Sequence, residues 1–239
     1  MATTLNKFII DDIELQLDIQ SGVFVPTATT TSLINSVKEY IKKPGKLLDL
    51  GAGSGVVGIT LSLKGLVESP LFASDLSDGA SECISKNSAR YDVPVVIKEG
   101  SLLEPWENEK FDYIVDDISG VAEEVAKLSP WFDNVPCQSG AGGADLTIQV
   151  LQKANKYLND GGLLFFPVIS FSDLDKILEV AKQNFTNVEL LQRDEWPLPK
   201  DMYKHVSVLQ RIKEKGHIQF QEKFGMILCF TDIYVAFNK

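Results

Sequence analysis

The sequence predicts a single α/β domain built on a doubly wound, mainly parallel sheet of seven strands, with an antiparallel last strand and a short N-terminal hairpin and helix. Short apolar segments of strand length alternate with segments of helical periodicity along the chain. A chain of 239 residues with 44% hydrophobic content can bury a sizeable core. We expect the hairpin and first helix in residues 1–43 and a Rossmann-like core in 44–239, with no linker between them.

The N-terminal region predicts a hairpin followed by a helix. Residues 8–20 alternate between apolar and polar side chains, and Asp11-Asp12 suits the turn between two strands. Hydroxyl residues before Leu33 suit a helix N-terminus, and the apolar residues from Leu33 to Ile41 fall on one helical face. Pro44-Gly45 ends this helix.

The remaining elements follow in order. Strands are expected at 46–50, 71–75, 93–100, 111–117, 163–169, 187–195 and 226–238. Helices are expected at 56–65, 77–91, 146–162 and 173–183, the third closed by Gly161-Gly162. Residues 193–205, broken by prolines, are expected to form a loop before the last helix and strand. Strands separated by helices imply right-handed crossovers, and ligands then bind beyond the carboxyl ends of the strands.

Composition excludes several classes of protein. A net charge of −10 disfavours a nucleic-acid partner. The three cysteines are widely spaced and fit reduced thiols, and the chain has no apolar run of membrane-spanning length and no signal peptide at its start. We therefore expect a cytoplasmic protein. The two histidines, His205 and His217, have no clustered partners of ligand spacing, so no metal site is expected.

The glycine-rich turn after the strand at 46–50 is the strongest candidate for a ligand site. Such a turn lets the backbone approach a ligand closely and offers the free N–H groups of the next helix. Gly53, Gly55 and Gly58 spell the dinucleotide fingerprint, but the frame is wrong because Gly51 is the first glycine after the strand. Asp49, two residues before Gly51, suits a ligand with a cationic ammonium group better than one with a pyrophosphate.

On this turn the sequence resembles the class I S-adenosylmethionine-dependent methyltransferases, whose first motif is an acid followed by GxGxG. Asp75, which ends the next strand, matches the acid that binds both ribose hydroxyls in that family, and two carboxylate oxygens can accept from both. Ser101 stands where the family carries an acid at the adenine edge. The resemblance implies an S-adenosylmethionine site that contains Pro26, Thr30, Asp49, Gly51, Ala52, Gly53, Gly55, Asp75, Leu76, Ser101 and Leu102.

Within that class the sequence is most similar to the HemK-like glutamine methyltransferases. The segment 22–34, with Pro26 and Thr30, resembles the entry to the family's first long helix, and Gly142-Gly143-x-Asp145 resembles its Gly-Gly-x-Asp loop. Two features depart from the family. The family has an additional N-terminal helical domain, whereas this sequence starts almost at the hairpin. The family's Asn-Pro-Pro-Tyr motif falls on residues 117–120, Asp-Ile-Ser-Gly. Glutamine specificity is therefore not carried over.

Asp116 and Asp117, at the end of the strand 111–117, are the candidate catalytic residues. A carboxylate at this edge of the sheet can orient or deprotonate a methyl acceptor. The alternative is that one of the two caps the helix expected just after them. Trp131-Phe132 and the pair Trp196 and Tyr203 are weaker candidates for walls of the substrate pocket, since each can equally pack on the protein itself.

These observations predict an S-adenosylmethionine-dependent methyltransferase whose acceptor is a small molecule or a protein or peptide side chain. Three alternatives stay open: methylation of glutamine or another amide with an atypical motif, a non-catalytic cofactor-binding subunit of a complex, and a nicotinamide-dependent dehydrogenase. The acceptor, the oligomeric state and the need for a partner subunit are not specified by the sequence.

Overall fold

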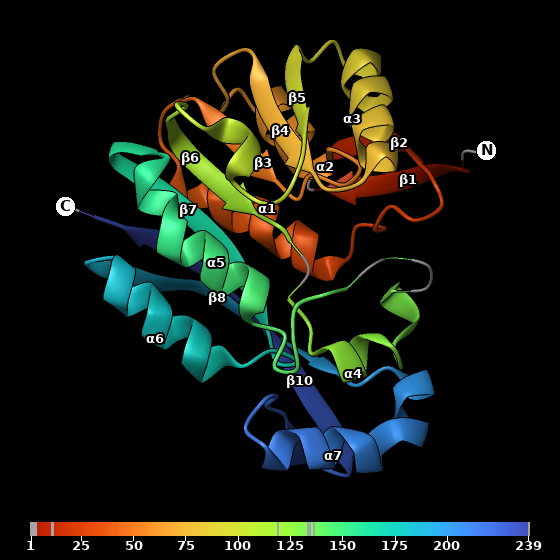
Figure 1. The fold of residues 1–239 in the computed structure, drawn as a ribbon. Helices are drawn as coiled ribbons and strands as arrows, with labels where there is room; N and C mark the ends of the chain where they lie inside the picture. The colour runs from red at the N-terminus through yellow and green to blue at the C-terminus, as the bar shows by residue number, and fades with distance from the viewer. Residues whose placement is uncertain (1–3, 11, 119, 133–134, 136, 239) are drawn as a thin grey trace.

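The computed structural model describes residues 4–10, 12–118, 120–132, 135 and 137–238. Its main sheet has the order β5-β4-β3-β6-β7-β10-β8, and a short β9 pairs with β10 (Figure 1). The pairings from β5 to β7 are parallel, and β10 is antiparallel to both β7 and β8. The predicted fold class is therefore confirmed, with β9 (Gln221–Lys223) as an unpredicted addition.

Most strands lie close to their predicted positions. The sheet strands are β3 (Leu47–Leu50), β4 (Leu71–Asp75), β5 (Val95–Glu99), β6 (Phe111–Asp116), β7 (Leu158–Ile169), β8 (Asn187–Pro197) and β10 (Met226–Phe237). The N-terminal hairpin consists of β1 (Thr4–Ile10) and β2 (Ile13–Ile19), with Ile10 opposite Ile13. Asp11, predicted in its turn, lies outside the described residues.

Helices cover both faces of the sheet. One face carries α1 (Ala28–Tyr40), α2 (Val56–Leu63) and α3 (Asp78–Arg90), with the hairpin packed on the same core. The other face carries η1 (Glu104–Trp106), α5 (Asp145–Lys153), η3 (Ala154–Lys156) and α6 (Leu174–Asn184). Figure 1 shows α5 and α6 side by side.

A third apolar cluster lies beyond the carboxyl ends of the strands. It contains α4 (Glu123–Ala126), η2 (Pro130–Phe132), η4 (Lys200–His205) and α7 (Val206–Glu214), packed around Phe171 and Met202. These elements form the lower part of the molecule in Figure 1. They close the edge of the sheet at which a ligand is expected.

Two boundaries differ from the prediction. The helix expected at 146–162 ends at Lys153, and Gly161-Gly162 lie inside β7, at an irregularity in its pairing with β6. The positive φ of Gly161, +72°, serves that irregularity instead of a helix end. Residues 193–197 belong to β8 and 200–205 form η4, because Leu228 and Cys229 of β10 pair with Pro197 and Trp196.

Asn87 of α3 holds the hairpin against the glycine-rich turn after β3. Its side chain is fully buried, its Nδ2 donates to the carbonyls of Asp18 and Ser54 at 2.9 Å, and its Oδ1 accepts from the N–H of Asp18 at 2.7 Å. A buried amide with three satisfied bonds links three separate segments.

Asn87→Ala is expected to lower the free energy of unfolding by about 2 to 3 kcal/mol, because it leaves buried backbone groups without partners. Urea denaturation measures this loss. The exposed Asn155, which bonds Asn184 and Asn238 at the surface, provides the control Asn155→Ala, whose effect should stay under about 1 kcal/mol. Equal effects of the two substitutions would contradict the role given to Asn87.

Candidate active site

One cavity of about 960 Å³ lies at the carboxyl ends of the strands. Its walls come from the turn after β3, from the ends of β4, β5, β6 and β8, from the first turn of α1, and from η2 and β10. Gly51, Asp75, Ser101 and Leu102 line one half, and Trp131, Asp194, Trp196 and Thr231 line the other. Asp117 and Thr30 also line it.

The glycine turn is shaped by its approach to the strand beside it. Gly51 has a φ of +72°, and a side-chain carbon placed on it would lie 2.6 Å from Cγ2 of Ile118. Only glycine fits this position. Gly53 has a φ of +53°, and a carbon placed there would meet no atom closer than 3.9 Å. The surface of the turn above Gly53 is therefore open toward a ligand.

Asp75 is held at the cavity wall by two backbone donors. The N–H of Gly53 donates to Oδ2 at 2.9 Å, and the N–H of Ser77 donates to Oδ1 at 3.0 Å. Each carboxylate oxygen keeps a second lone pair with which to accept a hydroxyl. Leu76 beside it is 70% exposed and, with Leu102, offers apolar surface for a flat ring. This half of the cavity therefore fits a nucleoside.

Asp49 lies behind the turn. It is fully buried, is absent from the cavity lining, and its Oδ2 accepts the N–H of Gly58 at 2.8 Å. This hydrogen bond stabilises the start of α2. The predicted part of Asp49 in cofactor binding stays a prediction.

The two adjacent acids after β6 have different surroundings. Asp117 lines the cavity, and its Oδ2 accepts the hydroxyl of Thr30 at 3.0 Å. Asp116 is 1% exposed, and its Oδ1 accepts the N–H of Ile118 at 3.2 Å. Asp116 is absent from the cavity lining, because neighbouring side chains of a strand point to opposite sides, and its acceptor-side role stays a prediction. Neither residue caps α4, whose N-terminal residue Ala122 has no side-chain cap.

Burial raises the pKa of three carboxyl groups at this edge of the sheet. Loss of solvation is the largest cause for each, and it raises the pKa of Asp49 to about 7, of Asp116 to about 8 and of Asp117 to about 7. The hydrogen bond from Thr30 acts in the opposite direction on Asp117. A cationic ligand bound here would favour the ionised forms.

The remaining predicted residues divide into two groups. The first group lines the cavity and consists of Thr30, Gly51, Gly53, Asp75, Leu76, Ser101, Leu102 and Asp117. The second group lies outside the lining and consists of Pro26, Ala52 and Gly55. Ala52 is buried below the turn, and Gly55 is the N-terminal cap residue of α2. The contacts of the lining residues with a cofactor stay predictions.

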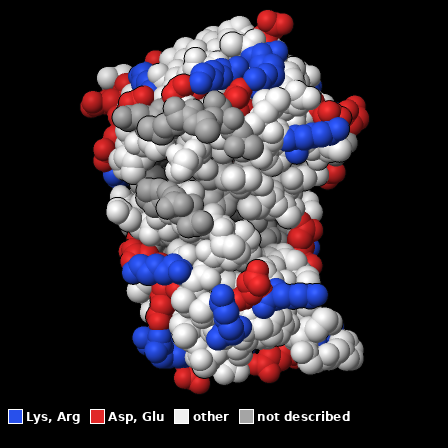
Figure 2. Space-filling view, turned by 90° about the vertical axis from the view of Figure 1, so that its right-hand side faces the viewer, with Lys and Arg blue, Asp and Glu red and all other residues white. Residues whose placement is uncertain are grey.

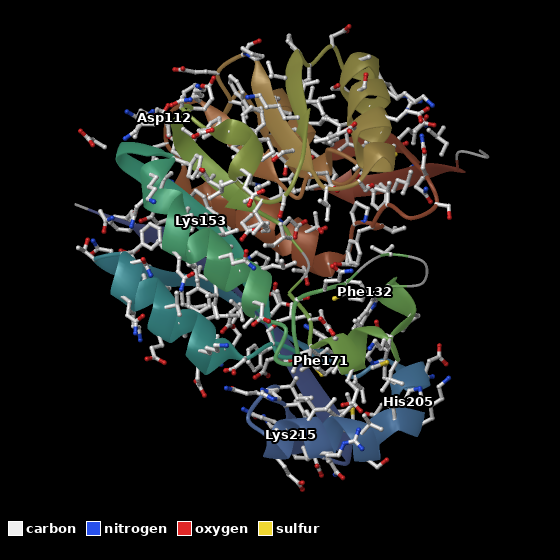
Figure 3. The ribbon with its side chains drawn as sticks, viewed as in Figure 1. Asp112, Phe132, Lys153, Phe171, His205 and Lys215 are labelled. Atoms are coloured by element: carbon white, nitrogen blue, oxygen red, sulfur yellow. The ribbon has the colours of Figure 1, made fainter. Side chains whose placement is uncertain are left out.

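Several cavity residues were not predicted from the sequence. Ser32, Asp194 and Thr231 come from α1, β8 and β10. Trp131, Phe132 and Trp196, predicted only as possible walls, all line the cavity, whereas Tyr203 does not. Figure 3 shows Phe132 and Phe171 around α4, with His205 farther out at the edge of the molecule.

Other ligand classes find little support in the described residues. They contain no group of three or more His, Cys, Asp or Glu side chains that could hold a metal ion. Within the same part of the chain, no helix is long and apolar enough to cross a membrane. On the face shown in Figure 2, Lys and Arg are interspersed with Asp and Glu and form no continuous basic surface.

Comparisons with known proteins agree with this geometry. Residues 14–117 match the family described as "Methyltransferase small domain". The release factor glutamine methyltransferase of Geobacter sulfurreducens is 27% identical over 63% of this chain and 54% of its own. The ribosomal protein L11 methyltransferase of Lactobacillus helveticus is 24% identical over 76% of this chain and 49% of its own. The chain thus spans about half the length of these relatives.

Solved structures share the fold. A 16S rRNA methyltransferase of T. thermophilus in complex with AdoMet and guanosine has a TM-score of 0.63 at 15% identity, over 99% of this chain and 51% of that one. The ribosomal protein L11 methylase of Lactobacillus delbrueckii subsp. bulgaricus has a TM-score of 0.54 at 18% identity, over 88% and 79%.

The glycine turn, the fold and these matches together support a class I S-adenosylmethionine-dependent methyltransferase. Within that class it lies near the HemK-like group, which includes the release factor enzymes. S-adenosylmethionine is the cofactor of the class, and the open turn at Gly53 and the carboxylate of Asp75 fit its adenosine part.

Asp75→Ala is expected to weaken binding of S-adenosylmethionine by about 1 to 3 kcal/mol, because two ribose hydroxyls lose their acceptor. Calorimetric titration measures the affinity. Glu99, exposed at the end of β5 and paired in register with Asp75, provides the control Glu99→Gln, which should bind normally. An unchanged affinity of Asp75→Ala would refute its assignment to the ribose.

The carboxyl cluster also predicts a pH effect on stability. A group whose pKa is higher in the folded protein favours the folded state at low pH, and that contribution is lost as the pH rises through the folded pKa. Asp116→Asn removes one such group but retains an acceptor for Ile118. The pKa of Asp116 rises from 3.8 to about 8 on folding. We therefore expect the stability of the variant relative to the wild type to increase as the pH rises from 4 to 8, by up to about 1.4 kcal/mol per pH unit, and to level off above pH 8.

Melting curves at several pH values measure this difference. The control is Asp201→Asn, which removes a negative charge from an exposed site on η4. A difference between wild type and Asp116→Asn that does not change with pH would show that Asp116 is not protonated in the folded protein.

Proposed function

We propose that this protein transfers the methyl group of S-adenosylmethionine to an acceptor bound in the half of the cavity lined by α1, β8, β10 and η2. The observation that carries the proposal is that one cavity contains both the turn at Gly51 and Gly53 and the carboxylate of Asp117. When bound, the cofactor supplies a methyl group attached to a positively charged sulfur. The neutral thioether that remains after transfer is a good leaving group for in-line displacement of the methyl group.

Asp117 is the residue that orients the acceptor in this proposal. Its backbone N–H donates to the carbonyl of Leu50 at 3.0 Å, so its position is tied to the end of β3, directly before Gly51. The Thr30 hydroxyl holds its Oδ2. A carboxylate fixed in this way can accept a hydrogen bond from the acceptor and align its lone pair, and it can take up the proton that methylation releases.

The apolar and aromatic side chains around Asp117 exclude water from the reacting atoms. Ile118 and Val121 follow it along the chain, and Phe132 packs on Phe24 across the cavity with ring centroids 5.4 Å apart. Exclusion of water strengthens the interactions of the Asp117 carboxylate.

The glutamine acceptor named for the release factor relatives is not part of this proposal. Ile118 packs on the turn at Gly51, and Gly120 carries no side chain, so neither of these two residues offers a planar amide the aromatic face of the family's tyrosine.

Asp117→Asn is expected to reduce methyl transfer by about a hundredfold or more, while S-adenosylmethionine still binds, because the substitution removes the base but keeps the shape and the Thr30 contact. Formation of S-adenosylhomocysteine with a panel of amine, hydroxyl and peptide acceptors measures the transfer. Calorimetric titration with S-adenosylmethionine, with NAD as the negative control, measures binding. Full activity of the variant would reduce Asp117 to a structural residue, and binding of neither cofactor by the wild type would refute the proposed function.

A further inference from the structure

The walls of the cavity carry charge of only one sign among the described residues. Asp75, Asp117, Asp194 and Glu195 are the ionisable side chains in its lining, which contains no Lys, Arg or His. Asp75 lies on the nucleoside side, and the other three lie toward the acceptor. Because like charges repel in a partly desolvated cavity, an anionic acceptor would be disfavoured there.

Asp194 of β8 is held by neutral groups alone. The hydroxyl of Ser32 donates to its Oδ2 at 2.5 Å, and Nε2 of Gln192 donates to both oxygens at 2.8 and 2.9 Å. These donors orient the carboxylate without cancelling its charge. By contrast, the charge of Asp232 on the neighbouring strand is neutralised, because its carboxylate is paired with the guanidinium of Arg193 at 2.5 Å. No such cation lies against Asp194 in the described part of the chain.

Aromatic rings stand beside this carboxylate. Trp196 lies two residues along β8 from Asp194, and its Nε1 donates to the hydroxyl of Thr231 at 3.0 Å, which fixes the ring. Trp131 meets Trp196 edge to face with centroids 5.9 Å apart. Aromatic faces bind flat apolar groups and attract cations, and cations are attracted most strongly by Trp.

From this pairing of unneutralised carboxylates with fixed aromatic rings, we infer that the methyl acceptor is an amine, protonated in solution and carried on a flat or apolar body. The inference rests on the proposed methyl transfer and names its substrate class. Asp194 and the rings bind the cation and its body, and Asp117 lies between them and the cofactor turn.

The reaction balances with the groups present. The ammonium group gives one proton to the Asp117 carboxylate, which leaves a lone pair on nitrogen. The nitrogen then forms a bond to the methyl carbon as the carbon–sulfur bond breaks, and the electron pair of that bond stays on sulfur. The product is an N-methylammonium ion, and Asp117 returns its proton to water. The carboxylates also offset the repulsion between two cations in one cavity.

The test compares amines with alcohols of the same skeleton. Calorimetry is carried out on the protein saturated with S-adenosylhomocysteine at pH 7.5, with 2-phenylethylamine against 2-phenylethanol and tryptamine against tryptophol. Each pair differs only in the ammonium group. We expect an amine to bind at least tenfold more tightly than its alcohol in at least one pair.

Asp194→Asn should remove most of that preference, since it keeps the shape of the side chain and removes its charge, while S-adenosylhomocysteine binds as before. The matched control is Glu189→Gln on the same strand, whose carboxylate accepts the hydroxyl of Tyr40 outside the cavity lining and whose loss should not change amine binding. Binding of each amine no tighter than its alcohol, or a preference that survives in Asp194→Asn, overturns the inference. Failure of S-adenosylhomocysteine to bind the wild type would instead count against the proposed function.

Discussion

The site depends on the close contact between the carboxyl ends of β3 and β6. These strands pair in parallel, and the N–H of Asp117 donates to the carbonyl of Leu50 just beyond the last residue of β6. The contact brings Ile118 so near to Gly51 that no side chain fits at that position of the turn. It therefore places the cofactor turn and the candidate catalytic carboxylate side by side, and it also concentrates three carboxyl groups where solvation is poor.

The first turn of α1 connects this contact to the rest of the sheet. Thr30 bonds Asp117 after β6, Ser32 bonds Asp194 of β8, and Thr29 lies 3.3 Å from the hydroxyl of Thr231 on β10. Hydroxyl groups of one short segment thus meet three strands. The same helix packs on the apolar core through Leu33, Ile34 and Val37, so burial of that face positions the hydroxyls over the cavity.

Local patterns in the sequence were enough to predict the order of strands and helices and the glycine turn. A buried strand that enters a turn of glycines has a specific signature, because positive φ angles and close backbone contacts exclude other residues. The error at Gly161-Gly162 arose because a glycine pair suits a helix end and a strand irregularity equally well. Pairing with β6 decided between them.

The acceptor half could not be predicted because its residues are distant in sequence. Ser32 and Asp194 are 162 residues apart, and no local pattern in either segment points to the other. The orientation of the acids after β6 was within reach, since adjacent residues of a strand face opposite sides and only one can enter the cavity. The sequence does not show whether Asp116 or Asp117 enters the cavity. That choice depends on the contact of Asp117 with Thr30, a residue of another element.

A crystal structure of the protein with S-adenosylhomocysteine would test the central claim most directly. We expect the ribose hydroxyls to lie on the carboxylate of Asp75 and the backbone of the turn at Gly53 to contact the ligand. The sulfur should face the half of the cavity shared by Asp117 and Asp194. A ligand bound with its sulfur away from Asp117, or bound outside this cavity, would contradict the central claim.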